Sequence, residues 1–155
     1  MTTVAAKVST GEIAADTMVS DDETFYSSSK LRIGKNSIYG ACGTWKHILT
    51  AFNLIETNNS EWDSDMDVEV LELRPDGIYI YDGISIPNKL LNDFWAVGTG
   101  APFALAAMHL GLSPREAVAL ACKYDVGSNE PIESYKLEDE IASKKGIRRR
   151  SNSGV

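Results

Sequence analysis

The order in which hydrophobic residues change their spacing is the most restrictive feature of this sequence. Short apolar runs bounded by glycine and polar turn residues occupy the first 42 positions, and such runs are typical of strands. These runs cover residues 3–8, 12–15, 31–33 and 37–42. Trp45, Ile48, Leu49 and Phe52 then recur at helical spacing. The pattern predicts four strands followed by a helix over residues 44–55.

The second half of the chain also begins with strands. Three further strands are expected at residues 68–73, 78–81 and 93–97. Arg74-Pro75-Asp76-Gly77 joins the first two, because proline and glycine stand where a tight turn needs them. By contrast, residues 16–29 are rich in Ser, Asp and Thr, and we expect a loop or an irregular excursion there.

Helices dominate the last third. Proline near the first turn predicts a helix over residues 102–109. The capping box Ser113-Pro114-Arg115-Glu116 opens a second helix that runs to Tyr124. A short strand over residues 131–137 and a charged helix from Glu138 complete the order. Separate blocks of strands and helices favour a layered α+β domain over a β–α–β winding.

Length and charge set the domain organisation and exclude some functions. We expect one domain over residues 1–140, followed by a basic, disordered tail over residues 141–155. The net charge is −7, yet the last twelve residues hold five basic residues and no acid. The domain itself is therefore strongly acidic, which argues against nucleic-acid binding. No apolar run approaches the length of a membrane span.

The cysteines and histidines give no sign of a disulfide framework or a metal site. Cys42 and Cys122 lie far apart in the sequence, and His47 and His109 form no ligand-spaced pair. We expect a reducing, cytoplasmic location, no metal and no cofactor.

Thr2 suggests a chemistry of its own. Threonine is small enough for methionine aminopeptidase to remove Met1, which would leave Thr2 with a free α-amine beside its own hydroxyl. The pKa of an unperturbed α-amine is about 8, so a sizeable fraction of it is neutral near physiological pH. One residue could then supply both nucleophile and base. Many proteins begin with Met-Thr, so this feature needs support from the rest of the chain.

Six short motifs supply that support, because they occur together and in one order. They are Thr2-Thr3-Val4-Ala5, Ile13-Ala14-Ala15-Asp16, Ser29-Lys30-Leu31-Arg32-Ile33, Gly40-Ala41-Cys42-Gly43, the run from Ala96 to Ala104, and Asp125-Val126-Gly127-Ser128. The set resembles the proteasome-type peptidases, which are N-terminal nucleophile hydrolases. Within them it is most similar to the two-ring bacterial proteasome-like peptidases, through the run Gly98-Thr99-Gly100-Ala101-Pro102-Phe103 and the threonine directly after Met1.

The resemblance implies a fold and a set of catalytic residues. The fold would be an αββα four-layer sandwich, with a shortened second helix region at Thr57–Asp67. Thr2 would be the nucleophile, Lys30 the cation beside it, and Asp16 the partner that orients Lys30. The Gly43 N–H would donate to the oxyanion. Thr99 would form a hydrogen bond near the Thr2 amine, and Asp125 and Ser128 would support Thr99.

Each of these residues also has an ordinary structural explanation. Asp16 and Lys30 alone are typical solvated charges, Gly43 alone is typical of a turn, and Thr99 alone is typical of a helix cap. Only their joint occurrence indicates catalysis. Gly98-Thr99-Gly100 is no dinucleotide-binding motif, because no β–α–β unit follows it.

The leading hypothesis is a threonine peptidase that acts on peptides or unfolded protein. The resemblance also implies a homo-oligomer, either a ring or a smaller closed assembly, and an ATP-dependent unfoldase as partner. Two alternatives stay open at this point. The same fold could serve a small-molecule amidase or acylase, or it could be a catalytically silent oligomeric scaffold.

Overall fold

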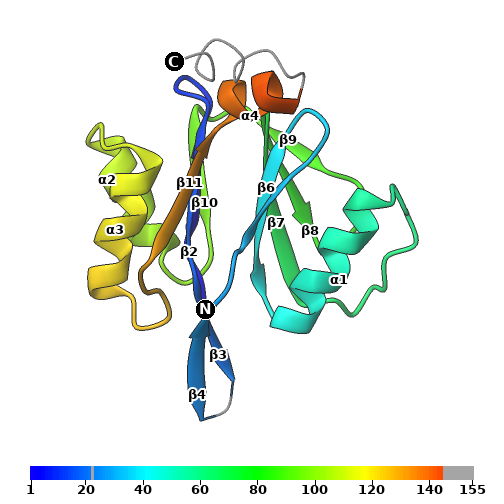
Figure 1. Ribbon diagram of the computed structural model, residues 1–155, viewed down its shortest axis with the longest axis horizontal. Coiled ribbons are helices and arrows are strands. Elements are labelled where there is room, and N and C mark those ends of the chain that lie inside the picture. Colours follow the sequence, from blue (N-terminus) through cyan, green and yellow to red (C-terminus); the bar gives the residue numbers. More distant parts are fainter. Residues whose placement is uncertain (22, 145–155) are drawn as a thin grey trace, which may run out of the picture.

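The computed structural model describes residues 1–21 and 23–144, and it has four layers. Two antiparallel sheets pack face to face, with helices on both outer sides (Figure 1). This is the αββα sandwich that the sequence predicted. None of the described helices has the length and apolar character needed to cross a bilayer.

The first sheet positions the N-terminus. Its strands run in the order β10-β1-β2-β11, and all neighbours are antiparallel. Their bounds are β1 Val4–Lys7, β2 Glu12–Asp16, β10 Phe94–Val97 and β11 Ile132–Lys136. Val4 opposes Val97 on one side and Ala15 on the other. The residues just before β1 are therefore held between the ends of β10 and β2.

The second sheet contains five strands in sequential order. They are β5 Leu31–Ile33, β6 Ile38–Gly43, β7 Val68–Arg74, β8 Gly77–Asp82 and β9 Asn88–Leu90. The core between the two sheets is made of large apolar residues, such as Ile13, Leu71 and Ile78, all completely buried. Burial of this kind supplies most of the driving force for folding.

Small residues on the outer face of the first sheet allow helices to approach it closely. Helices α2 (Ala101–His109) and α3 (Pro114–Tyr124) pack there against Ala5, Ala14 and Ala96. The expected capping box at the start of α3 is present: the Ser113 hydroxyl accepts from the Glu116 N–H, and the Glu116 side chain accepts from the Ser113 N–H.

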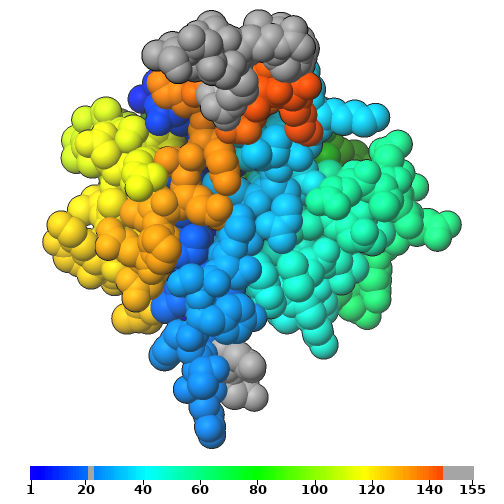
Figure 2. All heavy atoms as spheres, in the orientation of Figure 1, coloured from blue at the N-terminus to red at the C-terminus, as the bar shows by residue number. Residues whose placement is uncertain are grey.

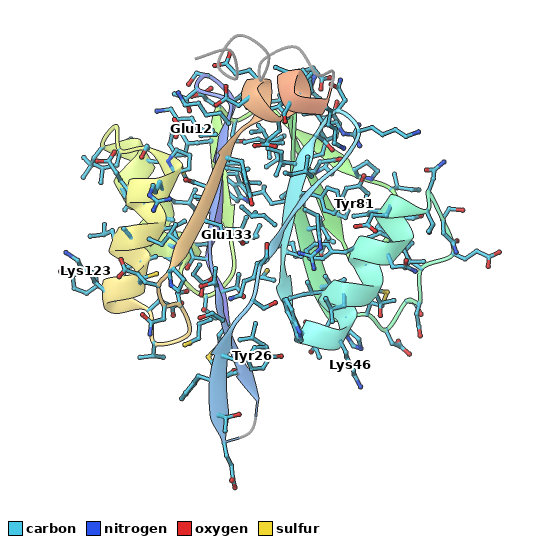
Figure 3. The ribbon with its side chains drawn as sticks, viewed as in Figure 1. Glu12, Tyr26, Lys46, Tyr81, Lys123 and Glu133 are labelled. Carbon is cyan, nitrogen blue, oxygen red and sulfur yellow. The ribbon has the colours of Figure 1, made fainter. Side chains whose placement is uncertain are left out.

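The outer face of the second sheet carries one helix, α1 (Trp45–Glu56). The ring of Phe52 packs edge-on against Tyr39 of β6, with 5.5 Å between centroids. Residues 57–67 form no helix, as the sequence predicted for a shortened region. Trp62 in this segment stacks instead on Tyr81 of β8, which is labelled in Figure 3. The Trp62 ring thus covers part of the outer face of the second sheet.

Two expectations about strands were wrong. Residues 16–29 are not irregular, since β3 (Met18–Asp21) and β4 (Thr24–Ser27) form a separate antiparallel hairpin. It projects from the body at the end where the N-terminus lies (Figures 1 and 2). Its polar composition hid it, because β4 is exposed along its whole length. Strand β9 was also missed, because it is an edge strand of three residues that pairs only with β8.

The C-terminal helix α4 (Leu137–Lys144) follows β11 directly. It extends past the expected domain boundary at residue 140, so the first residues assigned to the tail are helical. The rest of the expected basic tail, residues 145–155, lies outside the described residues.

Candidate active site

Thr2 lies just ahead of β1 and is almost completely buried, with 2% of its surface exposed. Met1 is still attached, so the Thr2 nitrogen is a peptide N–H in this structure. The Met1 side chain is exposed. The Thr2 hydroxyl donates to the Met1 carbonyl and accepts from Lys30. The nucleophile proposed from the sequence is therefore fixed in position from two sides.

Lys30 lies between Thr2 and Asp16, as the sequence predicted. Its Nζ is 3.0 Å from Thr2 Oγ1 and 2.9 Å from Asp16 Oδ1. The three residues are each at most 2% exposed. Lys30 comes from the segment between β4 and β5, and Asp16 ends β2, so the hairpin β3–β4 returns the chain to the same point. An ammonium group and a carboxylate are thus brought to one hydroxyl inside the protein.

Asp16 accepts hydrogen bonds through both of its oxygens. Besides Lys30, Oδ1 accepts from the backbone N–H of Thr3 at 3.0 Å. Oδ2 accepts from the N–H groups of Met18 at 3.3 Å and Asn129 at 3.1 Å. Three N–H donors and one ammonium group satisfy this buried carboxylate, and an amide side chain could not take its place because it would turn an N–H toward another donor.

Burial affects the protonation of Lys30. Loss of solvent lowers the pKa of Lys30 from its ordinary value, while the Asp16 carboxylate opposes this shift. A lysine in such a site releases its proton more readily than one on the surface. Its N–H groups are nevertheless aimed at Thr2 and Asp16.

A second carboxylate organises the other side of Thr2. The Thr2 N–H donates to Thr99 Oγ1 at 3.3 Å, and the Thr99 hydroxyl donates to Asp125 at 2.8 Å. Ser128 donates to the same Asp125 oxygen at 2.6 Å. Partial burial acts to raise the pKa of Asp125, but these hydroxyl donors hold that pKa below its usual value. The structure thus brings Thr99, Asp125 and Ser128 to the nitrogen of Thr2.

The glycines around Thr99 allow this approach. Gly98 has a φ of +98°, and a Cβ there would lie 2.1 Å from the Thr2 carbonyl oxygen. Gly100 donates its N–H to that same oxygen at 3.2 Å. The Gly-Thr-Gly sequence is therefore required by close backbone contact with Thr2, as well as by the turn into α2.

Gly43 is the one predicted site residue outside this hydrogen-bond network. It ends β6 with a φ of +127°, and a Cβ there would lie 2.2 Å from the Asp67 carbonyl oxygen. The end of β6 and the N-terminus lie at the same end of the sandwich (Figure 1). Burial raises the pKa of the neighbouring Cys42 thiol to about 12.

The sequence interpretation missed three contributors to the site, which are Thr3 and the backbone N–H groups of Met18 and Asn129. Thr3 is fully buried, and its hydroxyl is 2.7 Å from Ser128 Oγ. Asn129 contributes only its backbone N–H, which donates to Asp16. A polar residue at the start of a buried strand was a usable signal for Thr3. A backbone donor leaves no signal in the residue type, so Asn129 could not have been found.

A large cavity lies elsewhere in the molecule. It has a volume of about 790 Å³ and is lined by residues of the β5–β6 loop, the end of α1 and the β7–β8 turn, including Tyr39 and Arg74. A smaller cavity of about 240 Å³ adjoins the site and includes Asp125 and Ser128 in its wall. Within the described residues, no group of acids, histidines and cysteines is placed to hold a metal ion.

Comparison with solved structures identifies the architecture around this site. BPH from Thiobacillus denitrificans in complex with epoxomicin matches with a TM-score of 0.66 and 20% identity, covering 86% of this chain and 96% of its own. Eukaryotic HslV from Trypanosoma brucei matches with a TM-score of 0.68 and 21% identity, covering 86% and 97%. Both are proteasome-like peptidases. The chain has the proteasome-type fold.

BPH without this compound gives the same result, with a TM-score of 0.62 and 21% identity over 86% of this chain and 95% of its own. No protein-family profile matches the sequence. No curated protein matches it either. The proteasome-type fold predicted from six short motifs is thus confirmed by three-dimensional similarity, at an identity of about one residue in five.

Proposed function

We propose that this protein is an N-terminal threonine peptidase once Met1 has been removed. The observation that supports this most directly is the position of Lys30 Nζ, 3.0 Å from Thr2 Oγ1 and 2.9 Å from Asp16 Oδ1 in a buried cluster. A lone threonine hydroxyl is a weak nucleophile, and a cation beside it favours its deprotonated form.

The proposed reaction proceeds in two stages. Thr2 Oγ attacks the peptide carbonyl carbon, and its proton passes to the Thr2 α-amine. That amine then protonates the leaving nitrogen as the C–N bond breaks, which leaves an ester between substrate and Thr2. Water attacks this ester in the second stage and restores the hydroxyl.

The roles of the surrounding groups follow from their contacts. Lys30 would stabilise the developing alkoxide, with Asp16 holding its orientation. Thr99 would fix the amine, with Asp125 and Ser128 behind it. The Gly43 N–H would donate to the oxyanion, and one such donor contributes about 3 kcal/mol to the transition state in other hydrolases.

Hydrolysis of short fluorogenic peptides tests this proposal. Wild type and Thr2→Ser should cleave them, while Thr2→Ala should not, because only the first two retain a hydroxyl beside the amine. All three second residues are small enough for Met1 removal, and intact-mass spectrometry on each preparation verifies it. Equal cleavage by Thr2→Ala and wild type would show that the mechanism is wrong.

The same attack would hydrolyse a small-molecule amide, so the assay also includes non-peptide amides and N-acyl amino acids. The single helix on the outer face of the second sheet favours this alternative, since that layer differs from the usual arrangement. Turnover of small amides with no cleavage of any peptide would replace the peptidase by an amidase. A protein inert to both sets would be a scaffold.

We also propose that the protein works as a homo-oligomer in the cytosol. The hairpin β3–β4 exposes Phe25 (71%) and Tyr26 (46%), and Val126 near its base is 92% exposed. A lone two-stranded hairpin with such residues is only marginally stable in water, so a neighbouring subunit would stabilise it. The two free cysteines, Cys42 and Cys122, agree with a reducing compartment.

Native mass spectrometry tests the assembly. The expected result is a closed oligomer in wild type and dissociation in Phe25→Ser, whereas a monomeric wild type at micromolar concentration would contradict it. Tyr26, labelled on the hairpin in Figure 3, provides a second variant. An ATP-dependent unfoldase remains a prediction from the resemblance, and its expected effect is ATP-driven degradation of folded proteins but not of short peptides.

A further inference from the structure

The hydrogen bonds around Asp125 have only one consistent direction. Its Oδ2 atom accepts from Ser128 Oγ at 2.6 Å and from Thr99 Oγ1 at 2.8 Å. A hydroxyl group has a single proton, so each of these two groups has none left to donate. Their remaining contacts must therefore be made as acceptors.

Two further contacts are fixed by this rule. Thr99 Oγ1 accepts from the Thr2 N–H, 3.3 Å away. Ser128 Oγ lies 2.7 Å from Thr3 Oγ1, so Thr3 must be the donor in that pair. Protons thus point toward Asp125 from both ends, through Ser128 from Thr3 and through Thr99 from Thr2.

Thr3 bonds directly to one carboxylate of the site, Asp16, and reaches the other, Asp125, through the Ser128 hydroxyl. Its side chain belongs to the Asp125 network through Ser128, and its backbone N–H donates to Asp16 Oδ1 at 3.0 Å, the oxygen that Lys30 binds. The hydroxyl occupies a space left for it, because a Cβ on Gly100 would lie 1.8 Å from Thr3 Oγ1. Thr3 has no exposed surface.

We propose that the Thr3 hydroxyl is a positioning group for the Thr2 amine. By donating to Ser128, it strengthens the Ser128 bond to Asp125 and neutralises part of that carboxylate, because hydrogen bonds in a chain polarise one another. A fully charged Asp125 would act through Thr99 to favour the protonated amine, which cannot serve as a base. The proposal rests on the threonine peptidase mechanism and assigns a role to a residue that this mechanism does not include.

Thr3→Val tests it, since valine has the same shape and lacks the hydroxyl. We expect kcat to fall about tenfold with KM within about twofold, because ground-state binding of the substrate does not involve Thr3. The acidic limb of the pH–rate profile should move to higher pH, since the amine keeps its proton longer. Thr3→Ser retains the donor and should recover most of kcat and the original limb.

Thr17→Val is the matched control. Thr17 is also buried, at 4% exposure, and its hydroxyl donates to the Pro131 carbonyl at 2.6 Å, outside the Asp125 network. The same substitution there should lower stability and leave the pH–rate profile unmoved. A Thr3→Val profile and kcat that match those of Thr17→Val would overturn the proposal.

A second readout separates this proposal from the proposed function. The reaction rate of the trimmed N-terminus with acetic anhydride, followed over pH by peptide mass spectrometry, gives the pKa of the Thr2 amine without any substrate. Thr3→Val should raise this pKa, and Thr3→Ser should not. Equal pKa values in wild type and Thr3→Val would refute the role of Thr3, whereas absence of Thr2-dependent hydrolysis in wild type would refute only the peptidase.

Discussion

Replacing Lys30 by methionine should destabilise the folded protein as well as abolish its activity. Methionine fills a similar volume without the ammonium group, so the change mainly removes a charge. The Asp16 carboxylate, which has no exposed surface, is then left without its cation. Breaking a buried pair in this way costs about 3–5 kcal/mol, because one charge stays uncompensated inside the protein.

The structure indicates the lower end of that range. Asp16 retains three backbone N–H donors, at 3.0, 3.3 and 3.1 Å, after Lys30 has gone. Such donors stabilise an ionised carboxylate on their own. We therefore expect a loss of about 3 kcal/mol. For a chain of this length, that corresponds to a fall in Tm of roughly 6 to 12 °C.

Urea unfolding of Met1-trimmed protein measures this loss, and repetition at several protein concentrations separates it from any effect on assembly. Lys89→Met is the matched control. Lys89 also pairs with an aspartate, Asp76 at 3.4 Å, but both side chains are largely exposed. An exposed pair of this kind contributes little, so Lys89→Met should leave the unfolding free energy unchanged. Equal effects of the two substitutions would refute the reasoning about burial.

Three further outcomes follow from the site. Gly98→Ala should lower the free energy of unfolding by at least about 2 kcal/mol and remove activity, because it combines a positive φ with a Cβ 2.1 Å from the Thr2 carbonyl oxygen. Calorimetry should find a smaller loss of stability for Gly11→Ala, where a Cβ would meet nothing within 4 Å. The midpoint of the alkaline limb of the pH–rate profile should lie below pH 10.5, the ordinary pKa of lysine, because burial lowers the pKa of Lys30. Activity that stays constant up to that pH would contradict this prediction. Iodoacetamide at pH 8 should leave Cys42 unmodified until urea unfolds the protein, because burial raises its pKa to about 12, and peptide mass spectrometry reads the result.

The sequence predicted most of the sandwich because its central elements have strong local signals. The capping box at Ser113 and the apolar stripe of α1 depend on neighbours a few positions away, and both were assigned correctly. The hairpin β3–β4 and the strand β9 were not, since pairing with a partner strand, rather than a hydrophobic pattern, defines them. Such edge elements carry few buried residues from which a pattern could be read.

The residues of the candidate site were proposed from the motifs, whereas the contacts between them could not be predicted from the sequence. Ser128 is close to Asp125 in the sequence, but nothing there gives the distance or direction of the bond from Thr99, 26 positions earlier. Residue types named by the family resemblance, such as Lys30, could be assigned in advance. Groups that act through the backbone, such as the Asn129 N–H, could not, because every residue type except proline supplies an N–H.

The outer face of the second sheet carries one helix, α1, which supplies none of the hydrogen bonds described for Thr2, Asp16 and Asp125. The shortened region at residues 57–67 and the cavity of about 790 Å³ belong to the outer face of the second sheet and its far end. Thr2, by contrast, bonds to Thr99 and Gly100 in the turn before α2 and to Lys30, and the loop before β11 reaches it only through Asp16. The Thr99 turn and Asp16 belong to the first sheet, whereas Lys30 lies directly before β5 of the second sheet. Changes in the outer helical layer of the second sheet should therefore act on assembly and partner binding rather than on the chemical step.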